Sequence, residues 1–241
     1  MSTTLILGSG PNVLEARDWS RDHIDHILAI NNAFAVRPDW DSLIFPEDFP
    51  ELRRPTALSE GQRLVTADDY VPAQNEYGGF VYAGGTMAFT AGYWALYAHR
   101  PQILAFMGCD LTYDAAQTHF YGTGTADPLR PDVTLQSLEA KSARLMITAA
   151  MQGCAVVNLS QDPSRLVFPR ATLESIAAAQ PMPYNADLSE RARQLEVALG
   201  YVVPSGRYWL EEERFDPAKL REIDALWLEA ALAPTGASRD T

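Results

Sequence analysis

Residues 4–11 read Thr-Leu-Ile-Leu-Gly-Ser-Gly-Pro, a short apolar run that passes directly into a glycine-rich turn. The run has the length and composition of a buried strand, and Pro11 suits the first turn of a following helix. In such a turn, glycines let the backbone approach a phosphate, which the N–H groups at the start of the helix also attract. We therefore predict a nucleotide-binding loop made of Gly8, Ser9, Gly10, Pro11 and Asn12.

The residues after the turn exclude two better-known phosphate-binding loops. The dinucleotide fingerprint needs a third glycine, but Leu14 and Glu15 stand where a small residue is expected. A P-loop needs a Gly-Lys-Ser/Thr sequence, which does not follow either. An acidic residue that would hold an NAD ribose is absent from the end of the next strand, so a dehydrogenase is disfavoured. A tight turn without any ligand is the alternative interpretation.

Short apolar runs alternate with helical patterns through the rest of the first 180 residues. Strands are expected at 26–30, 42–45, 103–107 and 154–159, and helices at 87–98 and 133–152. This alternation is typical of βαβ units, so we predict an α/β fold, a Rossmann-like, mostly parallel sheet with helices on both faces. Residues 47–79 contain several prolines and mixed charges, and we expect a long insertion or a set of loops there, of the kind that often covers an active site.

This interpretation divides the chain into two parts. Residues 1–180 form the nucleotide-binding domain, and residues 181–241 form a helical C-terminal extension. The extension is expected to contain one helix at 188–199 and a second at 217–232, with a short hairpin between them at 201–209. Its tryptophans, Trp209 and Trp227, either pack into the core or form a face through which the chain makes a homo-oligomer.

Charge and composition limit the classes of partner. The chain carries 19 basic and 31 acidic side chains, a formal net charge of −12. Such a surface repels phosphate backbones, so we expect no nucleic-acid partner, whereas backbone groups in a cleft can still hold a single nucleotide. Because no apolar run of about 18 residues occurs and the N-terminus lacks signal-peptide features, we expect a cytoplasmic protein without a transmembrane segment. Cys109 and Cys154 lie in apolar runs and are expected to be free, buried thiols.

Two further groups of residues stand where a parallel sheet gathers its ligands. Asn31 and Asn32 end the second strand, where side-chain amides can bind a ribose or a base, or can cap a turn. Gly84, Gly85 and Thr86 precede a helix. They can offer N–H groups to a ligand, or Thr86 can simply cap the helix.

Two side chains after the strand at 103–107 could take part in chemistry. Asp110 either contacts the ligand or braces a neighbouring loop. His119 lies in a loop rich in Gly and Thr, and an imidazole can accept a proton from an attacking hydroxyl near cellular pH, although a lone loop histidine is more often structural. No Ser/His/Asp or Cys/His set is convincing, and no His or Cys pair has metal-ligand spacing. We therefore expect no metal site and no cofactor beyond a nucleotide or nucleotide sugar as substrate.

Taken together, these motifs resemble two known families. Bacterial sialyltransferases that use CMP-sialic acid share a Gly-x-Gly-Pro turn, an Asn after the second strand, a small-residue helix start, a Gly-x-Asp-x-x-Tyr run and a catalytic-loop His. In this chain the corresponding positions are Gly8 to Leu14, Asn31, Gly84 to Ala95, Gly108 to Tyr113, His119, and a late strand at Val156 to Leu159. The second family, a motility-accessory group that includes archaeal 6-hydroxymethylpterin diphosphokinases, is matched by Gly84-Gly85-Thr86, Gly108 to Tyr113, and Thr118-His119.

The sialyltransferase resemblance implies a metal-independent, glycosyltransferase-like enzyme that uses a nucleotide sugar. By this resemblance, CMP would be held by Gly8, Ser9, Gly10 and Asn31. His119 would deprotonate the acceptor, and Tyr113 or Tyr121 would stabilise the leaving phosphate. Those enzymes carry an Arg and a Ser ahead of the helix, where residues 81–83 here read Val-Tyr-Ala. The nucleotide half of the site is therefore better supported than a sialic-acid half.

Two alternatives stay open. The diphosphokinase resemblance implies Mg²⁺-dependent phosphoryl transfer from ATP, with the metal held by Asp110 and a second carboxylate, for which Asp114 is the nearest candidate. The other alternative is a non-catalytic binding or assembly protein that shares only the fold with these enzymes.

Overall fold

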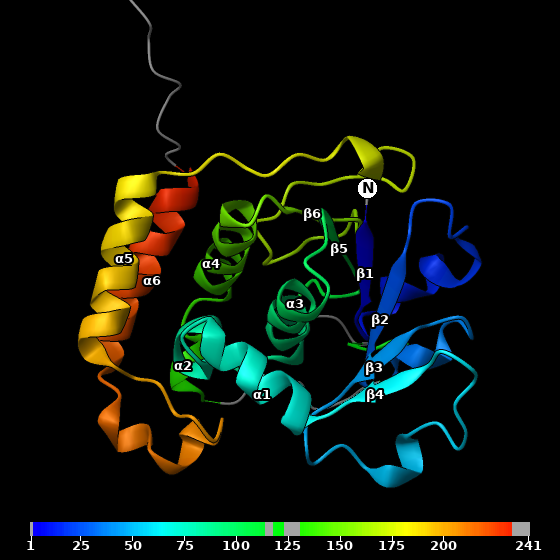
Figure 1. The fold of residues 1–241 in the computed structure, drawn as a ribbon, viewed down its shortest axis with the longest axis horizontal. Helices are drawn as coiled ribbons and strands as arrows, with labels where there is room; N and C mark the ends of the chain where they lie inside the picture. Colours follow the sequence, from blue (N-terminus) through cyan, green and yellow to red (C-terminus); the bar gives the residue numbers. More distant parts are fainter. Residues whose placement is uncertain (1, 114–117, 123–130, 233–241) are drawn as a thin grey trace, which may run out of the picture.

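The computed structural model describes residues 2–113, 118–122 and 131–232, and its centre is one parallel sheet (Figure 1). The sheet has six strands in the order β4-β3-β2-β1-β5-β6. Their bounds are β1 (Thr3–Leu7), β2 (His26–Ile30), β3 (Ser42–Ile44), β4 (Arg63–Val65), β5 (Ile103–Met107) and β6 (Ala155–Asn158). The predicted α/β class with a Rossmann-like parallel sheet is confirmed.

The order of the strands creates a switch point between β1 and β5. After β1 the chain moves outward through β2, β3 and β4, and it then returns to place β5 on the other side of β1. The loops at the carboxyl ends of β1 and β5 therefore leave in opposite directions, which opens a crevice at this edge of the sheet. The Gly-Ser-Gly-Pro turn begins at Gly8, directly after β1, so it lies where open α/β sheets bind ligands.

Four α-helices cover one face of the sheet, and Figure 1 shows them between the sheet and the C-terminal helices. They are α1 (Ala67–Glu76), α2 (Phe80–Ala83), α3 (Met87–Ala98) and α4 (Leu138–Met151), the last preceded by a 3-10 turn, η5 (Val133–Leu135). α3 is apolar on nearly every side and is buried accordingly. Gly92 is needed there because a Cβ at this position would lie 2.7 Å from Leu145 of α4.

Three 3-10 helices contribute to the opposite face. They are η1 (Pro11–Asp18), η2 (Asn31–Ala35) and η6 (Ile176–Ala178). Apolar side chains from all three pack with Leu5 and Leu7 of β1, whereas Ile6 points to the α-helical side. Because both faces of the sheet are covered, its strands read as continuous apolar runs.

The expectation that residues 47–79 form only loops is wrong. This segment contains η3 (Glu51–Arg53), the edge strand β4 and the helix α1, which begins with a capping box between Thr66 and Asp69. The sequence pattern hides them because β4 has three residues and α1 carries Pro72 in its interior. The hairpin expected at 201–209 is also absent, since this described stretch holds no strand and ends in a 3-10 turn, η7 (Tyr208–Leu210), followed by η8 (Glu212–Arg214).

The C-terminal extension contains two long helices, α5 (Ala186–Leu199) and α6 (Pro217–Leu232); α6 packs on α4, and α5 packs on α6 (Figure 1). Trp227 is buried in this interface, and its Nε1 donates a hydrogen bond to Glu196 Oε1 at 2.8 Å. The buried pair Arg144–Glu196 joins α4 to α5, with N and O atoms 2.7 Å apart. Trp209 is 52% exposed, and its part in a homo-oligomer stays a prediction.

Two further expectations concern the whole chain. Both Cys109 and Cys154 are buried and free, as predicted. Within residues 2–113, 118–122 and 131–232, no helix has both the length and the apolar character needed to cross a membrane.

Candidate functional site

A cavity of about 220 Å³ opens at the carboxyl ends of β1, β2 and β5, and we call it the carboxyl-edge cavity. Many of the residues predicted from the sequence meet there. Its lining includes Gly8, Ser9, Gly10, Asn31, Asn32, Thr86, Tyr113, His119 and Tyr121. These residues come from five separate stretches of the chain, so the fold assembles the constellation that the motifs predicted.

The glycines of the first loop are needed for a close contact between two loops. Gly8 N–H donates to Met107 O, and Gly10 N–H donates to Gly108 O, both at 2.8 Å. A Cβ at Gly8 would lie 2.2 Å from Gly108 O, which no side chain can accommodate. The two N–H groups are therefore engaged with the β5 loop, and the part of this turn left for a ligand centres on Ser9.

Ser9 and Asn31 leave buried polar atoms unpartnered beside the cavity. Among the described residues, Ser9 Oγ and Asn31 Oδ1 are two of eight side-chain atoms that are shielded from solvent and have no hydrogen-bond partner. Asn31 also adopts a left-handed backbone (φ 53°), a conformation that costs a non-glycine residue about 1 kcal/mol. Native folds seldom leave such groups unsatisfied, so their presence in one cavity indicates a place where a ligand completes the hydrogen bonding.

Two groups give the carboxyl-edge cavity a positive electrostatic potential. Thr86, Met87 and Ala88 line it, so the first turn of α3 presents its N–H groups and positive dipole end there. Arg53, from η3, also lines the cavity, and it makes no ion pair with the residues of the described ranges. Sequence reasoning missed Arg53 because it lies in the segment that was expected to form loops.

His119 lies in a tight turn that is fastened to the first loop. His119 and Gly122 exchange two backbone hydrogen bonds of 3.0 Å, and Phe120 N–H donates to Ser9 O at 2.9 Å. The imidazole ring is 5.0 Å from the ring of Tyr121 and 6.5 Å from that of Tyr113. Partial burial lowers the pKa of His119, so the ring is neutral at cellular pH and able to accept a proton.

Asp110 and Asn12 lie outside the cavity and brace the loops behind it. Asn12 Nδ2 donates to Asp110 Oδ2 at 2.7 Å and to Ser160 Oγ at 2.8 Å. Asn158 Nδ2 donates to the other oxygen, Asp110 Oδ1, at 3.0 Å. Both carboxylate oxygens are thus occupied, which matches the bracing role. Pro11, at the start of η1, is not part of the cavity lining either.

Gly84 and Gly85 also turn away from the carboxyl-edge cavity. Gly84 has a φ of +93° and packs against Phe89 and Lys141. Gly85 N–H donates to Thr134 Oγ1 at 3.0 Å. Of this predicted group only Thr86 reaches the cavity, and its Oγ1 caps α3 by accepting from Phe89 N–H at 3.4 Å.

A second cavity of about 390 Å³ adjoins the first, and Met87 lines both. We call it the aromatic cavity because its walls include Tyr70, Phe80, Tyr208 and Trp209. Charged side chains at this cavity are Glu47, Asp48 and Arg207. These residues are separated by as many as 160 positions in the chain, so no local motif could have predicted the cavity.

Comparison with known proteins adds no family to this description. No family model, no curated protein and no solved structure matches the chain.

Proposed function

We propose that the chain binds a nucleotide or nucleotide sugar in the carboxyl-edge cavity and transfers the sugar to an acceptor hydroxyl. The observation that carries this proposal is the pair of buried, unpartnered atoms, Ser9 Oγ and Asn31 Oδ1, in a switch-point cavity with Arg53. The Rossmann-like sheet alone would not carry it, because one fold hosts many functions.

In this proposal the cavity divides its polar groups between the parts of a nucleotide. The first turn of α3 and Arg53 attract the phosphate. Ser9 Oγ donates to a phosphate or ribose oxygen, and Asn31 Oδ1 accepts a hydrogen bond from a ribose hydroxyl or a base amine. The negative surface of the protein does not oppose this binding, because the anion is held by local donors inside a cleft.

The transfer step follows from the position of His119. The acceptor oxygen forms a bond to the anomeric carbon while the bond from that carbon to the phosphate oxygen breaks, and the electron pair leaves with the nucleotide. The acceptor proton passes to the neutral His119 imidazole. The rings of Tyr113 and Tyr121 lie 6.5 and 5.0 Å from that ring, and in this proposal their hydroxyls donate to the leaving phosphate.

The phosphoryl-transfer alternative finds less support. It needs Asp110 as a ligand of Mg²⁺, but both oxygens of that carboxylate accept hydrogen bonds outside the cavity. Asp114, the expected second carboxylate, lies outside the described residues. The third interpretation, a non-catalytic binding protein, differs from the proposal only in lacking turnover.

Calorimetry and a turnover assay test the proposal. CMP, CDP, UDP and GDP are titrated into the full chain without metal, and ATP is titrated with and without Mg²⁺. We expect at least one of the first four to bind, and Asn31→Ala to weaken it about tenfold because a buried partner is removed. Asp22→Asn, an exposed change far from the cavity, is the control. No binding at millimolar nucleotide would sink the proposal.

Turnover separates the enzyme from a binding protein. His119→Asn should leave nucleotide affinity within about twofold and reduce release of the nucleotide from its sugar at least a hundredfold, the usual contribution of a general base. Nucleotide binding without any sugar release from CMP-, UDP- or GDP-sugars would instead favour the non-catalytic interpretation. ATP binding that requires Mg²⁺ and is lost in Asp110→Ala would favour phosphoryl transfer.

A further inference from the structure

We infer that the aromatic cavity is a second ligand site, and that it takes an organic cation, an ammonium group on an apolar or aromatic body. The assignment of this ligand as the acceptor rests on the proposed function. Binding of the cation itself does not, because the aromatic cavity has its own walls and its own charge.

The walls form a continuous aromatic surface from three distant elements. The ring of Tyr70 in α1 meets that of Phe80 in α2 edge to face, with centroids 6.3 Å apart. Phe80 in turn stacks on Tyr208 at 6.1 Å, and Tyr208 meets Trp209 edge to face at 5.5 Å. Ring faces carry partial negative charge, so such a surface attracts a cation as well as apolar groups.

The charged side chains give the aromatic cavity a net negative charge. Arg207 Nη2 lies 3.5 Å from Glu47 Oε2 and offsets that carboxylate. Asp48 forms no ion pair within the described part of the chain, so its charge is not offset. Burial, with a smaller contribution from the charges of Glu47 and Asp48, raises the pKa of Tyr70 to about 12, so a further negative charge at this aromatic wall is disfavoured.

Size and position complete the assignment. A volume of about 390 Å³ is within the range of small-molecule sites and suits a compact ligand. Met87 lines both cavities, so a ligand in one lies next to a ligand in the other. The carboxyl-edge cavity offers Arg53 and a helix N-terminus, whereas the aromatic cavity offers Asp48. The first cavity therefore favours an anion and the second favours a cation. This arrangement suits a phosphate-bearing sugar donor in one cavity and an amine-bearing acceptor in the other.

Four small probes of similar size test the assignment by ligand-observed NMR and calorimetry on the full chain. They are phenethylammonium, phenethyl alcohol, phenylacetate and methyl glucoside. We expect phenethylammonium to bind at least about fivefold more tightly than the neutral alcohol, and phenylacetate not to bind. Equal binding of amine and alcohol, or tighter binding of methyl glucoside, overturns the assignment of a cation.

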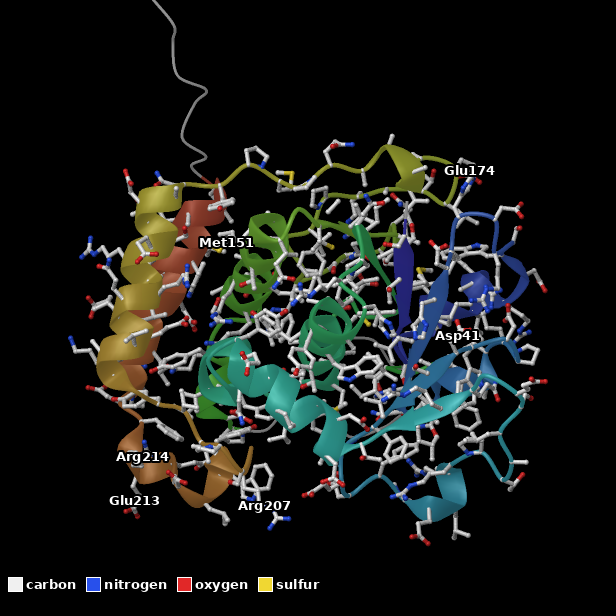
Figure 2. The ribbon with its side chains drawn as sticks, in the orientation of Figure 1. Asp41, Met151, Glu174, Arg207, Glu213 and Arg214 are labelled. Carbon is white, nitrogen blue, oxygen red and sulfur yellow. The ribbon has the colours of Figure 1, made fainter. Side chains whose placement is uncertain are left out.

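Variants place the cation in the aromatic cavity. Asp48→Asn and Trp209→Ala change exposed side chains, so both should fold, and each should weaken phenethylammonium about threefold to fivefold. Glu213→Gln is the control for the loss of charge, because Glu213 is exposed like Asp48 and does not line the cavity. It lies in the same loop region as Arg207 (Figure 2), and its substitution should have no effect. Equal weakening by Asp48→Asn and Glu213→Gln, with no effect of Trp209→Ala, would mean that the amine responds only to the net charge of −12, which overturns the site.

Parallel titration with the best-binding nucleotide separates the two proposals. Amine binding without nucleotide binding removes the proposed function and leaves the aromatic cavity as a cation site. Nucleotide binding without amine binding removes the cation site alone. If both bind, the acceptor role predicts that phenethylammonium, which has no hydroxyl to receive the sugar, occupies the acceptor position and slows nucleotide-sugar turnover. No effect on turnover overturns that role.

Discussion

The interface of α4 with α5 and α6 and the carboxyl-edge cavity both contain buried polar groups, but the two regions satisfy them very differently. At the interface, the Glu196 carboxylate accepts from Arg144 Nε, Arg144 Nη2 and Trp227 Nε1 at 2.7–2.8 Å. One oxygen of Asp224, which pairs with Lys141, is the exception. At the cavity, Ser9 Oγ and Asn31 Oδ1 have no hydrogen-bond partner within the described part of the chain. The difference separates polar groups that hold the fold together from polar groups that await a ligand.

The largest effect is expected from breaking the interface network. Glu196→Ala leaves Arg144 buried without its charge partner and should lower the free energy of unfolding by about 3–5 kcal/mol. Urea unfolding followed by circular dichroism measures this change. Glu190→Ala on the same helix breaks an exposed pair with Arg193 and should change stability by less than about 0.5 kcal/mol. Similar losses in the two variants would contradict the role given to burial.

The contact between the β1 and β5 loops gives the next largest effect. In Gly8→Ala the new Cβ meets Gly108 O, which is backbone and cannot move aside, so we expect a loss of about 1–3 kcal/mol in unfolding free energy. Gly61→Ala is the control, since nothing lies within 4 Å of its Cβ and only its φ of +85° opposes the change. That strain should cost about 1 kcal/mol, and nucleotide affinity should fall only in Gly8→Ala.

Gly8 also shows how far the sequence could predict this molecule. A glycine-rich turn after a buried strand predicted the switch-point loop correctly, because strand, turn and following 3-10 helix are neighbours in the chain. The sequence could not reveal that Gly108 is the group that requires Gly8 to be small, since that contact spans 100 positions. Short elements were missed for a related reason: β4 has three residues, too few to show a periodic pattern.

For the candidate site too, the sequence predicted the features that depend on neighbours in the chain and missed those that depend on distant residues. Residues directly after strands, such as Ser9 and Asn31, reach the carboxyl-edge cavity as expected. Asp110 occupies an equivalent place after β5, yet its side chain turns to Asn12 and Asn158. Position along the chain predicts which residues reach the edge of the sheet, but side-chain direction depends on neighbours from other segments. Arg53 and the whole aromatic cavity depend on such neighbours and were not predicted.

A pair of serines sharpens the comparison between the two regions. Ser9→Ala removes an unpartnered hydroxyl, so we expect stability to change by less than about 0.5 kcal/mol while nucleotide affinity falls about tenfold, or about 1.4 kcal/mol. Ser142 is a fully bonded counterpart, whose Oγ donates to Glu139 O at 2.8 Å and accepts from Val167 N–H at 3.0 Å. Ser142→Ala should lower stability by about 1–2 kcal/mol and leave affinity unchanged. The reverse pattern would mean that Ser9 is structural.

The smallest expected effect is a change in the titration of His119. Burial favours the neutral ring and lowers the pKa of His119 below its usual value, so this imidazole should gain its proton at a lower pH than a free imidazole does. A nucleotide phosphate in the cavity would favour the charged form and raise this pKa. NMR of the His Cε1–H signals, assigned with His119→Gln, measures both values.

Because the ion pairs at the α4, α5 and α6 interface do not contact the cavity, the signals of Trp227 should be unchanged by the nucleotide. If the His119 midpoint does not move when nucleotide binds, the phosphate does not lie beside this ring, and His119 loses its place as the base.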